Sequence, residues 1–126
     1  MQPTTLLLRQ IHPTWLKEDG HLLSVAFRPF PKDQGLLSVY DGDLITPDAS
    51  WGHYTRKLGN SSAGVWAVTV QETESCHLSA RSETEGQFPE HAVIDFTGQV
   101  EKEQKANSKI LAAKAEERGC LFLPPA

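Results

Sequence analysis

Residues 21–55 (HLLSVAFRPFPKDQGLLSVYDGDLITPDASWGHYT) constrain the fold more than any other part of the chain. They contain two short apolar runs, a polar turn between the runs and residues typical of a helix N-terminus. Apolar residues alternate over residues 21–28, which predicts a strand, and residues 36–40 predict another. Two prolines and a glycine separate the runs and break regular structure. We therefore expect an antiparallel hairpin whose stiff loop displays Lys32 and Asp33.

The end of this stretch carries the signals of a helix start. Thr46 is a hydroxyl N-cap, Pro47 fits the first helical position, and an acid follows in the first turn. Trp51, Tyr54 and Leu58 recur at helical spacing, so we expect them to form the buried side. His53 lies about 200° round from Trp51 at 100° per residue, which predicts that it lies on the outer face.

Four further segments have the composition of strands, and one has the composition of a helix. The strands are expected at residues 4–11, 64–70, 91–96 and 120–123. Residues 64–70 (GVWAVTV) give the clearest pattern, and we expect this strand to be central with Trp66 in the core. Residues 101–118 predict a helix with Ala106, Ile110 and Ala113 facing inward. Residues 71–90 are polar and acidic, so we expect an exposed loop there.

These elements predict one α+β domain over residues 1–126, with a mixed, largely antiparallel sheet of five to six strands and two helices packed on it. The length is enough for a core without metals or disulfides. Arg9 interrupts the first strand on the same side as its apolar neighbours. Either that side opens to water near Arg9, or the guanidinium has a buried partner.

Composition excludes some classes of protein. No apolar run is long enough to cross a bilayer, and the N-terminus lacks a basic segment and a cleavage site, so we expect a cytoplasmic protein without a membrane partner. A formal net charge of −4 disfavours nucleic acid as a partner. Cys76 and Cys120 have neither metal-binding nor disulfide spacing, so we interpret them as reduced thiols, with Cys120 beginning a buried strand.

The best candidate for a binding site lies where the expected hairpin meets the helix start. Paired acids beside a turn suit a hard cation, and a nearby Arg or Lys suits a phosphate. The alternative is ordinary turn chemistry, in which the aspartates accept hydrogen bonds from local backbone amides. The residues of this candidate site are Arg28, Lys32, Asp33, Tyr40, Asp41, Asp43 and His53.

Signatures of catalysis and of cofactor binding are missing from the sequence. The five histidines lack zinc-site spacing, no phosphate-binding or EF-hand loop is present, and no serine lies in a GxSxG motif. His91 and Asp95 lie roughly 13 Å apart along an extended strand, too far to pair directly. The sequence therefore predicts no metal, no cofactor and no assigned catalytic group.

One set of residues resembles the ADP-ribosyltransferases. The set comprises Arg9 or His12 on the first strand, residues 38–40 (SVY) on a middle strand and residues 72–74 (ETE) after another. In that family an Arg or His, a Ser or Tyr and a Glu from successive strands form the NAD site. The resemblance implies a nucleotide site built from these positions.

A second resemblance covers most of the chain. Residues 27–43 (FRPFPKDQGLLSVYDGD) and residues 89–96 (PEHAVIDF) resemble an uncharacterised family of small bacterial proteins. The resemblance implies that the polar turn and the His91 strand are shared features of that family, and it assigns no function.

The sequence therefore favours a small bacterial binding or accessory protein, of the immunity or antitoxin kind, that acts through a protein partner. The acidic segment 71–90 suits a charged partner. The alternative is a small enzyme that acts on a nucleotide or phosphate-bearing substrate, with an ADP-ribosyltransferase-like site.

Overall fold

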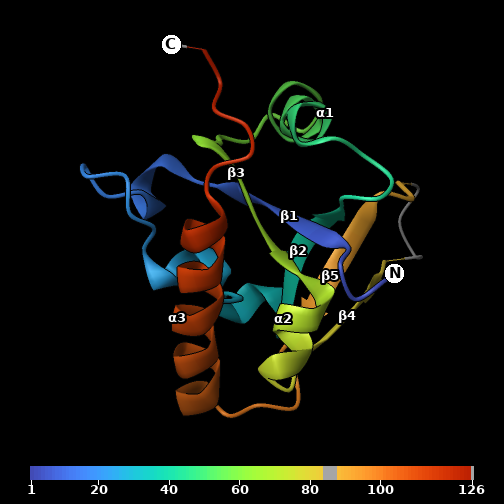
Figure 1. The fold of residues 1–126 in the computed structure, drawn as a ribbon, viewed down its shortest axis with the longest axis vertical. Coiled ribbons are helices and arrows are strands. Elements are labelled where there is room, and N and C mark those ends of the chain that lie inside the picture. Colours follow the sequence, from blue (N-terminus) through green and yellow to red (C-terminus); the bar gives the residue numbers. More distant parts are fainter. Residues whose placement is uncertain (84–87, 126) are drawn as a thin grey trace.

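The computed structural model describes residues 1–83 and 88–125 of the chain. In these residues five strands form one sheet in the order β3-β1-β2-β5-β4, and every neighbouring pair is antiparallel. Helices pack on the sheet (Figure 1), so the predicted α+β class is confirmed. The strands are β1 (Leu6–Ile11), β2 (Leu36–Asp41), β3 (Gly64–Thr69), β4 (Ser79–Ser82) and β5 (His91–Asp95).

Two helices were predicted, and both are present. They are α1 (Pro47–Gly52), which continues as a π-helical turn over His53–Lys57, and α3 (Glu101–Arg118). A further short helix, α2 (Val70–Ser75), follows β3 directly. The described chain also contains short 3₁₀ turns at Pro13–Trp15, Ser24–Phe27 and Pro31–Asp33.

The two faces of the sheet are covered by different elements. On one face α3, α2 and the turn Ser24–Phe27 enclose the larger core, which includes Leu7, Ile11, Leu37, Val68, Ile94 and Leu111. On the other face α1 and the C-terminal segment cover a smaller cluster built on Leu8, Tyr40, Val65 and Ala67. Figure 1 shows α1 at the opposite end of the molecule from α2. Both faces of the sheet are therefore covered, but on the second face α1 covers one end only.

The predicted hairpin between residues 21–28 and 36–40 is wrong. Residues 21–28 contain a single bridge residue, Leu22, and the 3₁₀ turn Ser24–Phe27 instead of a strand. Ala26 and Phe27 are fully buried in the larger core, and Glu116 of α3 accepts a hydrogen bond from the Leu22 N–H. A short apolar run does not distinguish a strand from a compact turn, and packing against α3 decided between them here.

β3 is an edge strand, although it was predicted to be central. Trp66 is nonetheless 6% exposed and lies in the larger core with Val68 and Val70, as the alternation predicted. The outer edge of β3 is covered by the C-terminal segment, because Val65 exchanges backbone hydrogen bonds with Leu121 and Phe122. This pairing amounts to an isolated bridge, and Cys120 before it is exposed, so the predicted buried strand there is wrong.

Residues 71–90 do not form one exposed loop. α2 occupies most of its first third, and β4 then pairs with β5. Thr73, Cys76 and Leu78 are buried. The rest of the predicted loop includes residues 84–87, which lie outside the described residues. The polar composition predicted a loop where α2 forms, because α2 begins with a capping box. In this box Thr69 and Glu72 each accept a hydrogen bond from the other's backbone amide.

α3 begins and ends where the sequence predicted, but it buries a different stripe. Ser108, Leu111, Ala112 and Ala115 face the core, whereas Ile110 is 48% exposed. The stripe follows helical spacing but is rotated from the predicted one. Half of the residues in this helix are charged and most of its apolar residues are alanines, so the pattern only weakly fixed which side would be buried.

Candidate functional site

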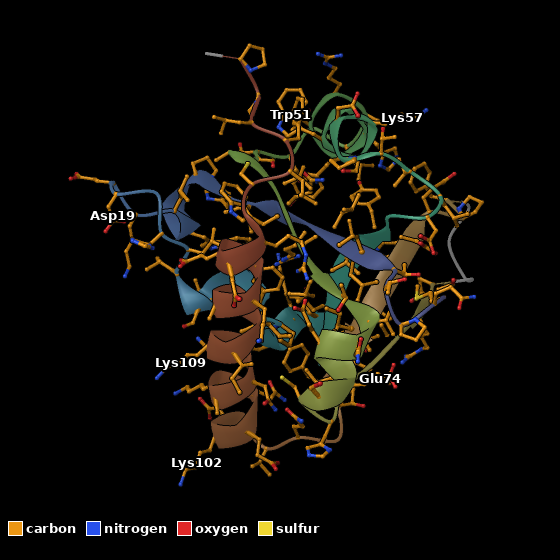
Figure 2. The ribbon with its side chains drawn as sticks, viewed as in Figure 1. Asp19, Trp51, Lys57, Glu74, Lys102 and Lys109 are labelled. Atoms are coloured by element: carbon orange, nitrogen blue, oxygen red, sulfur yellow. The ribbon has the colours of Figure 1, made fainter. Side chains whose placement is uncertain are left out.

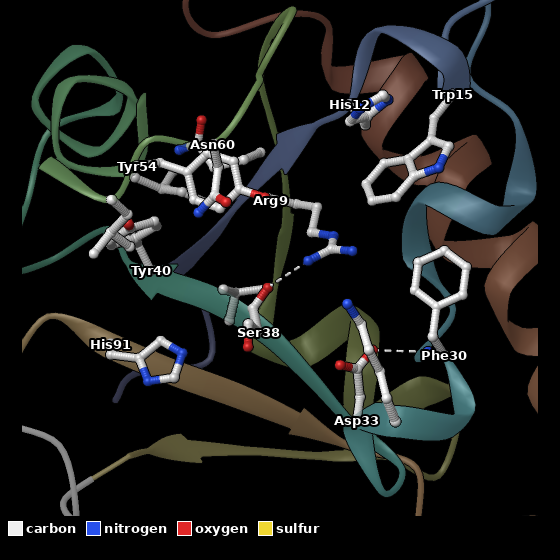
Figure 3. Close-up of a pocket in the computed structure, with 15 residues that line it drawn as sticks. Arg9, His12, Trp15, Phe30, Asp33, Ser38, Tyr40, Tyr54, Asn60 and His91 are labelled. Atoms are coloured by element: carbon white, nitrogen blue, oxygen red, sulfur yellow. Dashed lines mark hydrogen bonds between the residues drawn. The ribbon is translucent and has the colours of Figure 1, made fainter. Parts of the chain in front are cut away.

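A gap between two central strands creates a groove at the surface of the molecule. β1 and β2 pair only at Leu7↔Asp41 and Leu8↔Tyr40, whereas β1 pairs with β3 along its whole length. Beyond Leu8 the two strands separate, and a groove of about 430 Å³ lies beside the gap. Figure 3 shows the side chains that line it. They include Arg9, His12, Trp15, Phe30, Lys32, Asp33, Ser38, Tyr40, Tyr54, Asn60 and His91.

Arg9 bridges the gap between the separated strands. Its Nε donates to the carbonyl oxygen of Ala26 (2.8 Å), and its Nη1 donates to the carbonyl oxygen of Ser38 (2.9 Å). The structure thus combines the two alternatives for this residue, because the guanidinium has protein partners and also borders an open groove. Desolvation lowers the pKa of Arg9 to about 10, so the side chain stays charged at neutral pH.

The hydrogen-bond partners of Arg9 do not neutralise its positive charge, although the nearby Asp33 carboxylate stabilises that charge through space. Both partners are neutral carbonyls, and no ion pair joins Arg9 to an acid in the described residues. A guanidinium has five N–H donors, so donors remain for an incoming group. Its orientation is fixed by two hydrogen bonds before any ligand arrives. A guanidinium fixed in this way is suited to a carboxylate or a phosphate.

Aromatic rings form one wall of the groove. The guanidinium carbon of Arg9 lies 5.2 Å from the centre of the Trp15 ring. The Phe30 ring lies 5.9 Å from Trp15, and His12 lies 5.7 Å from it on another side. A cation held against an indole face gains electrostatic attraction while the ring excludes water. This wall suits a ligand with an apolar or aromatic part next to its anionic group.

The polar loop at Pro31–Asp33 forms the rim. Asp33 accepts a hydrogen bond from the Phe30 N–H (2.8 Å), which closes the turn (Figure 3). Gly35 follows with φ +81°, and a side chain there would clash with Thr97, so the turn requires glycine. Lys32 is exposed and adds a second positive charge to the groove. The loop is therefore locally fixed, although it does not connect two paired strands.

Tyr40 and His53 form the other end of the site. The Tyr40 hydroxyl and His53 Nδ1 share a 2.7 Å hydrogen bond, and Phe88 stacks on His53 with ring centres 3.8 Å apart. Burial, together with Tyr54, raises the pKa of Tyr40 to about 12. Burial lowers the pKa of His91, which lines the groove, so that ring is neutral at neutral pH. The predicted outward placement of His53 is wrong, because Tyr40 and Phe88 cover that side of the helix.

The structure brings together only part of the predicted site. Lys32, Asp33 and Tyr40 line the groove, and His53 lies behind Tyr40. Arg28 ends the turn Ser24–Phe27 and is not among the lining residues.

Of the two remaining predicted residues, Asp41 ends β2 and Asp43 lies in the turn that follows, and neither lines the groove. Asp41 accepts a hydrogen bond from the Asp43 N–H (2.9 Å), and Asp43 accepts one from the Thr5 hydroxyl (2.5 Å). The Asp41 contact is the turn chemistry that the sequence left as an alternative, whereas the Asp43 contact is a long-range bond to a side-chain hydroxyl. Within the described ranges, no cluster of three or more His, Cys, Asp or Glu residues is placed to hold a metal ion.

Leu58, predicted to be buried, is 54% exposed at the groove instead. The helix widens into a π-helical turn at His53–Lys57, and this changes which side each residue faces. The sequence also missed Trp15, Phe30 and Asn60 as site residues. Arg9 gave the one usable signal, since a charged residue within an apolar strand requires a special environment.

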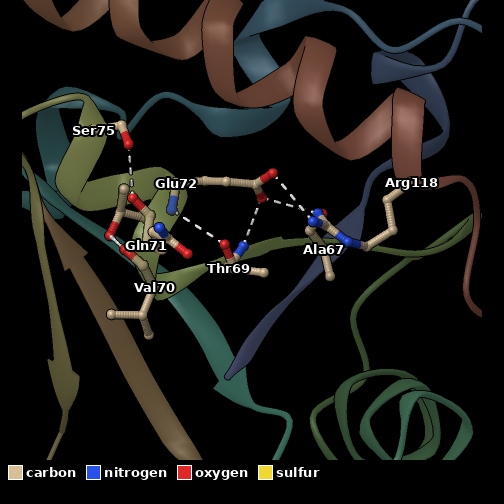
Figure 4. Close-up of polar contacts among 8 residues, drawn as sticks. Ala67, Thr69, Val70, Gln71, Glu72, Ser75 and Arg118 are labelled. Atoms are coloured by element: carbon tan, nitrogen blue, oxygen red, sulfur yellow. Dashed lines mark hydrogen bonds and ion pairs between the residues drawn. The ribbon is translucent and has the colours of Figure 1, made fainter. Parts of the chain in front are cut away.

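The ADP-ribosyltransferase-like set is not assembled. Arg9, Ser38 and Tyr40 meet in the groove, but Glu72 accepts two hydrogen bonds from Arg118 (2.9 and 3.1 Å) near the start of α2 (Figure 4). Arg118 also donates to the Ala67 carbonyl. The hydrogen bonds of Arg118 therefore connect α3 to β3 and, through Glu72, to α2. Glu72 is therefore a structural residue here, and neither Glu72 nor Glu74 lines the groove.

Among the described residues, the groove also has no serine paired with a histidine. Ser38, His12 and His91 all line it, but no hydrogen bond joins these side chains to one another in the described structure. Among the same residues, none of the helices has the length and apolar content that crossing a membrane requires. No family model, curated protein or solved structure matches the chain.

Proposed function

We propose that this chain is a binding protein that acts through a protein partner, and that the groove beside Arg9 receives an acidic segment of that partner. The observation that carries the proposal is the guanidinium of Arg9, which forms no ion pair in the described residues and is oriented by the carbonyls of Ala26 and Ser38. An acidic side chain entering the groove would form charge-assisted hydrogen bonds with donors that already point in fixed directions, which reduces the entropy lost on binding.

Two further features support a protein as the occupant. The groove opens at the molecular surface beside Lys32 and the exposed ring of Phe30, so an extended segment could enter without any lid moving. Trp15 and Arg9 belong to the residue types that most often dominate the energy of protein interfaces.

The biological setting that fits this proposal is an accessory protein of the immunity or antitoxin kind in a bacterial cytoplasm. Both cysteines are free thiols, and Cys120 is exposed, which suits a reducing compartment. An immunity protein or antitoxin acts by occupying a partner and needs no chemistry of its own. The bacterial setting in this proposal rests on the resemblance of residues 27–43 to small bacterial proteins.

A capture experiment with charge-reversal variants tests the proposal. The immobilised chain is exposed to an extract of the source organism, alongside Lys32→Glu and the control Lys102→Glu. Lys102 is exposed at the start of α3, where it projects away from the body of the molecule (Figure 2). We expect Lys32→Glu to lose most of the captured partner and Lys102→Glu to keep it, with equal thermal midpoints. Equal capture by both variants would contradict the proposal.

A phosphate-bearing nucleotide is the second candidate occupant. It is favoured by the joint presence of a fixed guanidinium and the neighbouring rings of Trp15 and Phe30, which suit a phosphate and a base respectively. Mass spectrometry of the small molecules released on heating the purified chain separates the candidates. A stoichiometric nucleotide that is absent from the Trp15→Ala variant would favour this reading over a protein partner.

A further inference from the structure

The two edges of the sheet are treated differently. At β3 the outer edge is occupied by the chain's own C-terminal segment, because Val65 donates to the Phe122 carbonyl (2.9 Å) and accepts from the Leu121 N–H (2.8 Å). At the opposite edge, β4 pairs with β5 on one side only. No described segment pairs with its other side. β4 therefore presents an open strand edge.

The register shows which backbone groups point outward. The Glu83 N–H donates to the His91 carbonyl, so the backbone N–H of Glu83 points towards β5. Antiparallel strands alternate between residues that face the neighbour and residues that face away. The backbone N–H and C=O groups of Arg81, which lies opposite Val93, therefore point towards β5. The same groups of Ala80 and Ser82 point away from β5. Those two residues can bond an added strand.

The side chain of Arg81 places a guanidinium group at this edge. Arg81 donates to the Asp95 carboxylate (2.7 Å) on β5, and its side chain is still 51% exposed. In a strand added outside β4, the residue opposite Arg81 would lie in a pair without mutual hydrogen bonds, where side chains approach most closely. An acidic residue at that position would bond the exposed side of the guanidinium, and a basic one would be repelled.

A second copy of the chain is a poor occupant for the same reason. If two β4 edges paired about a two-fold axis through mutual bonds of Ala80 and Ser82, Arg81 of one copy would lie directly opposite Arg81 of the other. Like charges directly opposite one another are destabilising in a sheet. The arginine therefore disfavours self-pairing and selects for a strand with the opposite charge.

We propose that the β4 edge accepts an extended, antiparallel segment of a partner protein that places an acidic residue opposite Arg81. Backbone hydrogen bonds to Ala80 and Ser82 supply the attachment, and the Arg81 contact supplies selectivity for charge. This surface is separate from the groove beside Arg9, and the proposal holds whether or not that groove binds a partner.

Two synthetic peptides test the proposal directly. One is a short alternating Thr/Val peptide with a central Glu, and the other has Lys at the same position. With the ¹⁵N-labelled full chain, we expect the Ala80 and Ser82 amides to exchange rapidly in the free protein and to become protected with the Glu peptide. Protection of both amides in the free chain, or no change with the Glu peptide at millimolar concentration, would overturn the proposal.

Variants separate strand addition from general charge attraction. Arg81→Glu should reverse the preference between the two peptides, changing the ratio of their Kd values by roughly fivefold or more. Ser82→Pro removes an outward N–H without disturbing the β5 ladder and should abolish binding, whereas Lys102→Glu should leave it unchanged. Binding that survives Ser82→Pro with unchanged Kd would contradict strand addition. Protection that grows with protein concentration alone would assign the edge to a second copy instead.

Discussion

The Nη1 of Arg9 donates a 2.9 Å hydrogen bond to the carbonyl oxygen of Ser38, which lies on a strand that has already separated from its own. In a continuous sheet, backbone amides of β1 would bond carbonyls of β2 at this position. Here a side chain replaces the ladder beyond Leu8. Arg9 therefore connects the two separated strands and also places a positive charge at the edge of the groove.

Arg9→Met should lower the free energy of unfolding by about 1–2 kcal/mol, because the Ser38 and Ala26 carbonyls lose charged donors. Urea denaturation measures the effect. Lys102→Met, which removes an exposed charge without known hydrogen bonds, is the matched control and should change little. An unchanged midpoint for Arg9→Met would show that water replaces the guanidinium without loss.

Trp66→Ala should destabilise the protein by about 3–5 kcal/mol, because the ring is 6% exposed and lies in the larger core. The comparison is Trp51→Ala, whose ring is only partly buried in the smaller cluster and should cost less. Chemical denaturation followed by far-ultraviolet circular dichroism measures both variants. Equal losses for the two would contradict the assignment of Trp66 to the main core.

Glu72→Gln should destabilise the fold by about 1–2 kcal/mol at neutral pH, since the carboxylate accepts bonds from Arg118 and from the Thr69 N–H. Desolvation raises the pKa of Glu72, but these bonds outweigh it and the net pKa is lowered. The carboxylate's contribution is therefore complete above its unfolded pKa and is lost as pH falls through the folded pKa. The difference between wild type and Glu72→Gln should shrink in acid, whereas exposed Glu74→Gln should have little effect at any pH.

Tyr40 should make the protein sensitive to alkali. Its pKa rises from 10.0 to about 12 on folding, chiefly by burial, so the unfolded chain loses the phenolic proton first. Stability from this group is complete below pH 10 and falls as pH rises towards 12, by on the order of 2 kcal/mol. Urea midpoints across this interval should fall less for Tyr40→Phe than for wild type. Parallel curves for the two proteins would contradict the buried state of the hydroxyl.

Local signals in the sequence predicted several elements well. The start of α1 followed from Thr46 and Pro47, and the Thr46 hydroxyl accepts the Ala49 N–H as an N-cap should. α3 begins and ends at the predicted residues, and Gly119 follows it with φ +96°. β5 lies within the predicted strand at residues 91–96. Each of these depends on residues within a few positions of one another, which a sequence pattern reports directly.

The sequence could not predict which strands are neighbours. The turn Ser24–Phe27 and the pairing of β2 with β1 and β5 depend on contacts between distant segments. The groove follows from the same arrangement, because Arg9 and Ser38 are brought together by sheet order alone. Lys32, Asp33 and Tyr40 were predicted as site residues because a proline-fixed turn precedes β2. The aromatic wall formed by Trp15 and Phe30 had no local signal.

Fluorine NMR of the chain labelled with fluorotryptophan tests the central claim most directly, because it observes the groove without altering its charge. Its three tryptophans are Trp15 in the groove, Trp51 on α1 and Trp66 in the core, and single Trp→Phe variants assign their resonances. On titration with the captured partner, we expect the Trp15 resonance to shift and saturate while the Trp66 resonance stays in place. A Trp15 resonance that remains unchanged at saturation would show that the partner binds elsewhere and that the groove is not its site.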